Sequence, residues 1–257
     1  MALLDLDHVT HFFGGLKAVD DLAVSVEKGE LFGLIGPNGA GKTTVFNLIT
    51  GVYAPTQGRI CLADRLLNGK APFQVCGAGV ARTFQTTRLF RSMTVLDNVR
   101  TAFHPALHPG LASSILRTRG AMRAEAEIAR RAAELLREFR LEPVADRRSV
   151  ELPYGEQRRL EIARAVATGP RLLLLDEPAA GLNQTESKEL MDLIGWIRNR
   201  YDLTVLLIEH DMRVVMGICE RIAVLDYGRL IAEGKPEAIR RDPRVIEAYL
   251  GEEVPTS

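Results

Sequence analysis

Short apolar runs alternate with turn residues near the N-terminus of this chain. β-Forming residues gather at Leu3–Leu6, Leu22–Val26 and Leu31–Ile35, with turn signals at Gly14-Gly15 and Lys28-Gly29 between them. The pattern predicts strands that lead up to the glycine-rich stretch after residue 35. After Thr168 the apolar runs return, each followed by polar residues, at Leu172–Leu175, Val205–Ile208 and Ile222–Leu225.

The middle of the chain, from Leu89 to about Arg148, follows the period of amphipathic helices. One face is apolar and the opposite face is charged, as shown by Ile128, Ala132, Leu135, Leu136 and Phe139 against Glu127, Arg131, Glu134 and Arg137. The stretch His104–Gly110 contains two prolines and a glycine, so we expect a loop there rather than a histidine metal site. A helical insert is therefore predicted to divide an α/β core.

Composition excludes several classes of protein. The chain has 257 residues, 46% of them hydrophobic and 26% charged, which is typical of a globular α/β protein. Lysine plus arginine equals aspartate plus glutamate, 33 each, so no basic field favours nucleic acid as the partner. No apolar run is long enough to span a bilayer and no signal peptide is evident, so we expect a cytoplasmic location, with membrane contact only through a partner.

The cysteines do not suggest a metal site or a disulfide. There are three of them, Cys61, Cys76 and Cys219, and none has C-x-x-C spacing. We expect reduced, buried side chains.

The stretch after Ile35 fits the phosphate-binding pattern G-x-x-x-x-G-K-[ST]. Its glycines allow backbone N–H groups to surround a polyphosphate, and Lys42 adds a positive charge for the β and γ phosphates. Thr43 is placed to ligate Mg²⁺, and a helix beginning near Gly41 directs its positive end at the same anion. The sequence therefore predicts a nucleoside triphosphate and Mg²⁺ as ligands, with these residues at the phosphates: Gly36, Pro37, Asn38, Gly39, Ala40, Gly41, Lys42, Thr43 and Thr44.

Two later strands are expected to end in polar side chains at the same edge of the sheet. Asp176 ends an apolar run and is placed to hold Mg²⁺ through water, while Glu177, the next residue, is placed to polarise the attacking water as general base. His210 follows another such run, and we expect it to contact the γ-phosphate.

A glycine turn opens a basic amphipathic helix at Leu152–Ala165, which is another potential anion site. Together with the phosphate loop, Gln85 in Arg82-Thr-Phe-Gln, the strand ending in Asp176-Glu177-Pro and His210, in this order, the chain resembles an ABC transporter ATP-binding cassette over nearly its whole length.

Further stretches resemble the ATP-binding subunit of branched-chain amino acid importers. They are Phe13–Val19, Arg82–Gln85 with Arg88–Val99, Glu177–Asn183 and Asp242–Gly251. Urea and lipopolysaccharide transporters have similar cassettes, so the ATPase of a urea or lipid transporter is the alternative. A soluble ABC ATPase would usually carry a coiled-coil insert or a second cassette, and a P-loop kinase would not explain Gly155 or His210.

The resemblance implies a fold class and a domain division. The α/β fold would be a P-loop NTPase cassette with a RecA-like core, an N-terminal antiparallel β subdomain and an inserted α-helical subdomain. We expect one ABC domain over residues 1–257, with the core at 1–87 and 166–257 and the helical subdomain at 88–165.

The resemblance also implies residue roles. Phe13 would stack on adenine, with Phe12 as the core phenylalanine. Gln85 would join the Mg²⁺ and γ-phosphate shell. The turn residues Tyr154, Gly155 and Glu156 would contact the ATP that is bound to a second subunit.

The same resemblance implies partners. Two ATP-binding subunits, as a homodimer or a related heterodimer, would pair head to tail and bury two ATP molecules. They would act on membrane permease subunits at the cytoplasmic face of the membrane, and indirectly on a substrate-binding protein; no nucleic acid is expected.

Three positions, in two segments, depart from the commoner family pattern. Pro153 and Tyr154 stand where serine and glycine are usual, so a hydroxyl expected on the γ-phosphate is missing. Asn183 stands where many cassettes have aspartate. We expect these changes to affect the rate of turnover and not the reaction.

Overall fold

The computed structural model describes residues 2–107 and 119–250. The chain forms two compact units, one made of residues 1–82 and 171–257 and the other of residues 83–170. The helical subdomain predicted from the sequence, residues 88–165, is slightly shorter than the second unit.

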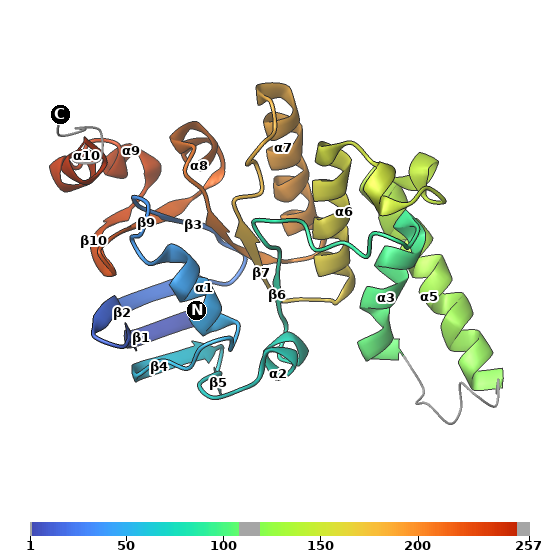
Figure 1. Ribbon diagram of the computed structural model, residues 1–257, viewed down its shortest axis with the longest axis horizontal. Helices are drawn as coiled ribbons and strands as arrows, with labels where there is room; N and C mark the ends of the chain where they lie inside the picture. The colour runs from blue at the N-terminus through green and yellow to red at the C-terminus, as the bar shows by residue number, and fades with distance from the viewer. Residues whose placement is uncertain (1, 108–118, 251–257) are drawn as a thin grey trace. The chain divides into compact units, whose positions relative to one another are not determined.

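The first unit contains two sheets (Figure 1). An antiparallel sheet has the order β2-β1-β4-β5. Its strands are β1 (Ala2–Phe13), β2 (Leu16–Glu27), β4 (Gln57–Leu62) and β5 (Arg65–Leu66). The strands predicted at Leu3–Leu6 and Leu22–Val26 are thus confirmed as β1 and β2, and each strand is longer than its apolar run.

The second sheet has the order β10-β9-β3-β8-β7-β6 and is parallel except for β10. Its strands are β3 (Leu31–Ile35), β6 (Val80–Arg82), β7 (Leu172–Asp176), β8 (Thr204–Ile208), β9 (Arg221–Asp226) and β10 (Arg229–Gly234). Every residue of β3, β7 and β8 is buried, which is why these strands are continuous apolar runs.

Helix α1 (Lys42–Ile49) lies between the two sheets of this unit (Figure 1). Its buried residues, Val45 and Phe46 among them, share one hydrophobic core with residues of both sheets. The phosphate-loop helix is therefore held from two sides. The other helices of the unit are α2 (Pro72–Gly77), α7 (Gln184–Arg200), α8 (Met212–Ile218), α9 (Pro236–Ile239) and α10 (Pro243–Leu250).

The second unit is helical, as expected. It contains α3 (Val95–Leu107), α5 (Arg119–Glu138), the short 3₁₀ turns η1 (Glu142–Val144) and η2 (Ser149–Glu151), and α6 (Tyr154–Ala167). The predicted apolar face of α5 is confirmed, because Ile128, Ala132, Leu135 and Leu136 are buried. Its charged face carries ion pairs from Arg130 and Arg131 to Glu127.

The loop expected at His104–Gly110 is wrong in its first half, because α3 continues to Leu107. Val95 and Val99 of this helix are fully buried. Pro105 lies in the last turn of this helix, where its missing N–H removes a single backbone hydrogen bond. Residues 108–110 of the expected loop lie outside the described residues.

The three cysteines carry free thiols, as predicted, but their burial differs. Cys219 is buried, Cys61 is half-buried and Cys76, near the end of α2, is exposed, so the expectation of burial is wrong for Cys76. No helix in the two described stretches is long and apolar enough to cross a bilayer.

Candidate functional site

Strand register brings the predicted phosphate-site residues of the first unit to one edge of the parallel sheet. Asp176 at the end of β7 is paired with Ile208 of β8, and Ile208 is paired with Leu34 of β3. Parallel strands end at the same edge, so the residues that follow them meet there. This edge therefore carries the phosphate loop, Asp176, Glu177 and His210.

The phosphate loop has the backbone conformation that its glycines allow. Gly36 has a φ of 150° and Gly41, the N-cap of α1, has a φ of 99°. A Cβ atom at Gly36 would lie 2.1 Å from Leu225 O, and one at Gly41 would lie 2.5 Å from Ala18 O. Both positions exclude any larger residue, because the neighbouring atoms are backbone.

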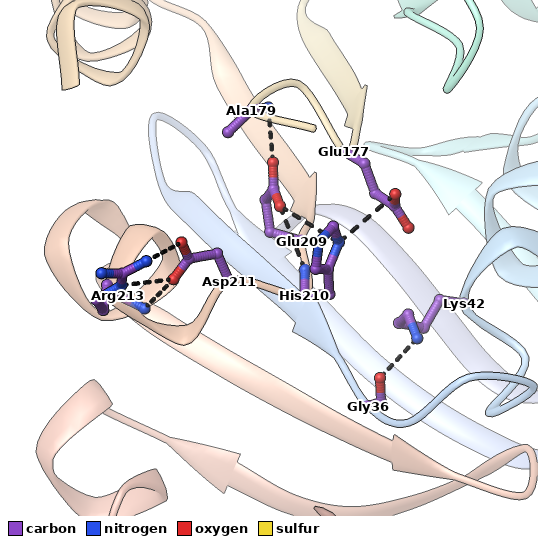
Figure 2. Close-up of polar contacts among 8 residues, drawn as sticks. All are labelled: Gly36, Lys42, Glu177, Ala179, Glu209, His210, Asp211 and Arg213. Atoms are coloured by element: carbon purple, nitrogen blue, oxygen red, sulfur yellow. Dashed lines mark hydrogen bonds and ion pairs between the residues drawn. The ribbon is translucent and has the colours of Figure 1, made fainter. Parts of the chain in front are cut away.

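Lys42 is nearly buried and its ammonium group donates to two carbonyl oxygens of its own loop. The distances from Nζ are 2.6 Å to Gly36 O and 2.7 Å to Pro37 O. Figure 2 shows the contact with Gly36. The side chain is thus folded over the loop. Thr43, the next residue, is exposed at the first turn of α1.

Asp176 is buried and forms an ion pair that sequence analysis did not identify. Arg82 at the end of β6 donates from Nη2 to Asp176 Oδ2 at 2.8 Å. The same guanidinium donates to Asn47 Oδ1 of α1 at 2.7 Å and lies over the ring of Phe46. One arginine therefore links the phosphate-loop helix to the aspartate at the end of β7.

Glu177 and His210 face each other across the sheet edge (Figure 2). His210 Nδ1 lies 3.6 Å from Glu177 Oε2, and the backbone N–H of Glu177 donates to Ile208 O at 2.9 Å. Glu177 has a φ of 47°, the left-handed region that non-glycine residues rarely adopt. The side chains that follow β7 and β8 thus lie at the same edge of the sheet, as the strand pattern predicted.

Glu209 lies beneath this pair and was also missed. It is 1% exposed, and its Oε1 accepts from the backbone N–H of Ala179 at 2.8 Å. Burial raises the pKa of Glu209, and the N–H groups of Ala179 and His210 oppose that shift. Glu209 ties the end of β8 to the segment that follows Glu177 (Figure 2).

Phe13 lies at the end of β1, at the turn into β2, with its ring 43% exposed. Phe12 is 37% exposed and its ring faces Lys17 Nζ, so the expectation that Phe12 is a core residue is wrong. The end of β1 extends beyond the core, so both faces of the strand are exposed there. The rings of Phe12 and Phe13, on alternate faces, therefore both lie at the surface.

Gln85 and residues 154–156 belong to the second unit. Gln85 is exposed, and its backbone oxygen accepts from Arg158 Nη2 at 2.5 Å. Arg158 also donates to Phe84 O at 2.7 Å and to Glu161 Oε2 at 3.0 Å. The side chains of Arg158 and Glu161 in α6 are both buried. Helix α6 therefore holds the backbone at Phe84 and Gln85 in place.

The turn before α6 begins with Pro153 as the N-cap, with φ −53° and ψ 152°. Tyr154 is exposed, and the Arg158 guanidinium lies over its ring. Gly155 and Glu156 fall in the first turn of the helix, where backbone N–H groups and the helix dipole favour an anion.

Two models of known protein families match this chain. The family model of the ABC transporter matches residues 19–180, and that of the branched-chain amino acid ATP-binding cassette transporter matches residues 229–255. The chain belongs to the ABC transporter family. It is an ATP-binding, ATP-hydrolysing cassette of that family.

Full-length relatives agree with this assignment. The high-affinity branched-chain amino acid transport ATP-binding protein LivG of Salmonella typhimurium is 51% identical over 97% of this chain and 98% of its own. BraF of Pseudomonas aeruginosa, of the same description, is 46% identical with the same coverage.

Solved ABC cassettes share the fold. The ADP conformation of MJ1267, an ATP-binding cassette of an ABC transporter, has a TM-score of 0.85 and 31% identity, covering 98% of this chain and 99% of that one. A dimeric post-hydrolysis state of the cassette MJ0796, bound to ADP and phosphate, has a TM-score of 0.75 and 28% identity, covering 91% of this chain and 98% of that one. The predicted fold class of this ABC ATPase is confirmed.

Sequence analysis missed the side chains that support the site, Arg82, Asn47, Glu209, Arg158 and Glu161. Arg82 stood in the quoted Arg-Thr-Phe-Gln motif, and Arg158 in the basic helix, so their charge was visible. Their partners lie 94 and 73 residues away along the chain, at Asp176 and Gln85, and no local pattern specifies such pairs.

Proposed function

We propose that this cassette hydrolyses ATP to power the import of branched-chain amino acids through permease subunits at the cytoplasmic face of the membrane. The observation that carries the proposal is the likeness over almost the whole chain to LivG and BraF, whose names state that transport. The match of residues 229–255 to the branched-chain cassette model supports it from a segment outside the ATP motifs.

The phosphate loop supplies the ATP site in this proposal. Backbone N–H groups from Gly36 to Thr44 surround the β and γ phosphates, and Lys42 exchanges its carbonyl acceptors in the loop for phosphate oxygens. His210 contacts the γ-phosphate from the facing strand. Phe13 stacks on the adenine.

Oxygen donors suited to Mg²⁺ lie at or near the same edge. Mg²⁺ prefers oxygen ligands and keeps several waters, so one or two protein side chains are sufficient. Thr43 and Asp176 fit that donor chemistry, and the side chain of Gln85 offers an amide oxygen of the same kind. Among the described residues no group of three histidine, cysteine, aspartate or glutamate side chains is arranged to hold a metal. When bound, Mg²⁺ neutralises charge on the β and γ phosphates.

Hydrolysis then depends on Glu177. Its carboxylate accepts a proton from the attacking water, and His210, 3.6 Å away, helps to orient that carboxylate. The turn Tyr154–Glu156 of a second cassette covers the γ-phosphate. Closure of the two cassettes on ATP and their opening after hydrolysis move the permease helices, and a substrate-binding protein delivers the amino acid outside.

Copurification and transport test the proposal. The tagged cassette, purified from its own membranes in mild detergent, should bring two permease subunits with it. Reconstituted with them and with a substrate-binding protein, it should drive ATP-dependent uptake of leucine, isoleucine and valine. The isolated cassette should bind none of the three in a calorimetric titration. Uptake of urea, or copurified lipopolysaccharide permeases, would overturn the assignment of substrate and leave the ATPase intact.

A further inference from the structure

Three aromatic rings contact one another at the tip of the β1–β2 hairpin. The ring of Phe13 is perpendicular to the ring of His11, at 85° with centroids 4.7 Å apart, and to the ring of Tyr53, at 81° and 5.2 Å. The rings of His11 and Tyr53 are stacked, at 14° and 5.5 Å. Each ring therefore contacts the other two, in geometries that aromatic pairs favour.

The cluster has two separate anchors. His11 and Phe13 are two residues apart on β1, so their side chains leave the strand on the same face. Tyr53 comes from the segment after α1, where its backbone N–H and that of Val52 both donate to Asn47 O, at 3.2 Å and 2.9 Å. Tyr53 is thus fixed to the helix whose N-terminus forms the phosphate loop.

His11 contributes a ring rather than hydrogen bonds. Both of its ring nitrogens are buried, and neither has a hydrogen-bond partner among the described residues. Unpaired buried polar atoms are unfavourable and rare. A phenyl ring at this position would pack in a similar way and would have no unpaired nitrogen atoms. We therefore infer that the imidazole ring of His11 acts here through packing against the other rings.

We propose that His11 and Tyr53 are positioning residues that hold the Phe13 ring in the orientation needed to stack on the purine of ATP. The inference rests on the proposed role of Phe13 and extends it to two residues that the motif does not include. Phe13 is 43% exposed, so part of this residue is open to a ligand while its ring contacts those of His11 and Tyr53. An exposed phenyl group at a hairpin tip would otherwise move among several rotamers. Holding it in one orientation beforehand removes the entropy that ATP binding would have to overcome.

Paired titrations of ATP and inorganic tripolyphosphate test this role. Phe13→Ala should weaken ATP binding by about 5- to 100-fold, the usual range for the loss of a stacked base. Tyr53→Ala and His11→Ala should each weaken it by about 2- to 10-fold, because an aromatic pair contributes that much. Tripolyphosphate has no base, so its affinity should stay the same in all three variants. A simple loss of folding would lower both affinities.

Conservative variants and a double variant separate positioning from direct contact. Tyr53→Phe and His11→Phe retain the rings and should bind ATP as the parent protein does, and His11→Phe should unfold at the same or a higher temperature. In the Phe13→Ala background, Tyr53→Ala should cause no further loss, because nothing remains to be positioned. Phe12→Ala is the matched control, since Phe12 is adjacent on β1 and similarly exposed but faces Lys17.

The outcomes distinguish this inference from the proposed function. If Phe13→Ala lowers ATP affinity while Tyr53→Ala and His11→Ala do not, the positioning role is wrong and the base site stands. If Phe13→Ala leaves the ratio of ATP to tripolyphosphate affinity unchanged, the base does not bind at Phe13 and both ideas fail. A further loss from Tyr53→Ala in the Phe13→Ala background would make Tyr53 a direct contact, which contradicts positioning.

Discussion

Glu177 is the residue on which the proposed chemistry depends most directly. Its backbone follows β7, its N–H group is bound to Ile208 O, and its carboxylate lies 3.6 Å from His210. The position is fixed by two strands, so replacing the carboxylate with an amide changes its basicity and leaves its placement almost the same.

We expect Glu177→Gln to bind ATP normally and to hydrolyse it about 10² to 10⁴ times more slowly, the usual contribution of a general base. Lys42→Ala should instead lose binding, because its charge acts on the bound phosphates. Phosphate release and nucleotide titration on the same preparations measure the two effects. Turnover near that of the parent in Glu177→Gln would rule out the assigned role.

Glu209 gives the site a pH dependence of its own. Burial raises the pKa of Glu209 above its ordinary value of 4.5, so the folded protein holds this proton to a higher pH than the unfolded chain does. The corresponding part of the free energy of unfolding is present below about pH 4.5 and is lost as the pH rises through the raised pKa.

Glu209→Gln should therefore remove part of this decline in stability with rising pH. Thermal unfolding of both proteins from acidic to neutral pH measures it, and the difference between the two curves isolates Glu209 from the other carboxylates. A difference that is constant with pH would contradict the assignment.

At the scale of elements, Asn183 is explained by the helix it begins. Its Oδ1 accepts from the backbone N–H of Glu186 at 2.9 Å, and Glu186 Oε2 accepts from the N–H of Asn183 at 3.0 Å. This is a capping box at the N-terminus of α7. The departure from aspartate thus keeps the cap, because both side chains offer an oxygen at the same place.

Asn183→Ala should destabilise the cassette by about 1 kcal/mol, the typical value of an N-cap. Asn183→Asp should be neutral or slightly stabilising, because a negative charge there favours the helix dipole. The melting temperature should fall by about 2 to 4 °C for the alanine variant. Equal destabilisation by both variants would show that the capping oxygen contributes nothing.

The elements also show how far sequence could specify the fold and the site. Apolar runs predicted β3, β7, β8 and β9, and the rule that parallel strands end together placed His210 at the same sheet edge as Asp176 and Glu177. Contacts between distant segments could not be predicted. The Arg82–Asp176 ion pair and the hydrogen bond from Arg158 to Gln85 O depend on which segments lie next to each other, and the exposure of Phe12 depends on where the core stops along β1.

For the whole molecule, the proposed dimer would draw the two halves of each ATP site from different units of two copies. The phosphate loop is in the first unit, and the Gly155 turn at the start of α6 is in the second. The related cassette MJ0796 has been solved as a dimer with ADP and phosphate. A head-to-tail dimer would place the Gly155 turn of each copy over the ATP of the other.

Light scattering should find mainly monomer without nucleotide, and dimer for Glu177→Gln with ATP and Mg²⁺, because ligand bound only in the dimer stabilises it by mass action. Gly155→Asp, which would place a carboxylate against phosphate, should prevent this dimer while leaving the monomer folded. A dimer of equal strength with and without ATP would contradict the sandwich.

The left-handed backbone at Glu177 has a consequence for any attempt to improve this protein. A φ of 47° costs a side-chain-bearing residue about 1 kcal/mol or more, whereas glycine or asparagine adopts it readily. Selection for heat resistance alone should therefore favour glycine or asparagine at position 177, and each of these removes the carboxylate. At this position a gain in stability would remove the carboxylate proposed as general base, so a screen for thermostability alone would select a cassette that hydrolyses ATP far more slowly.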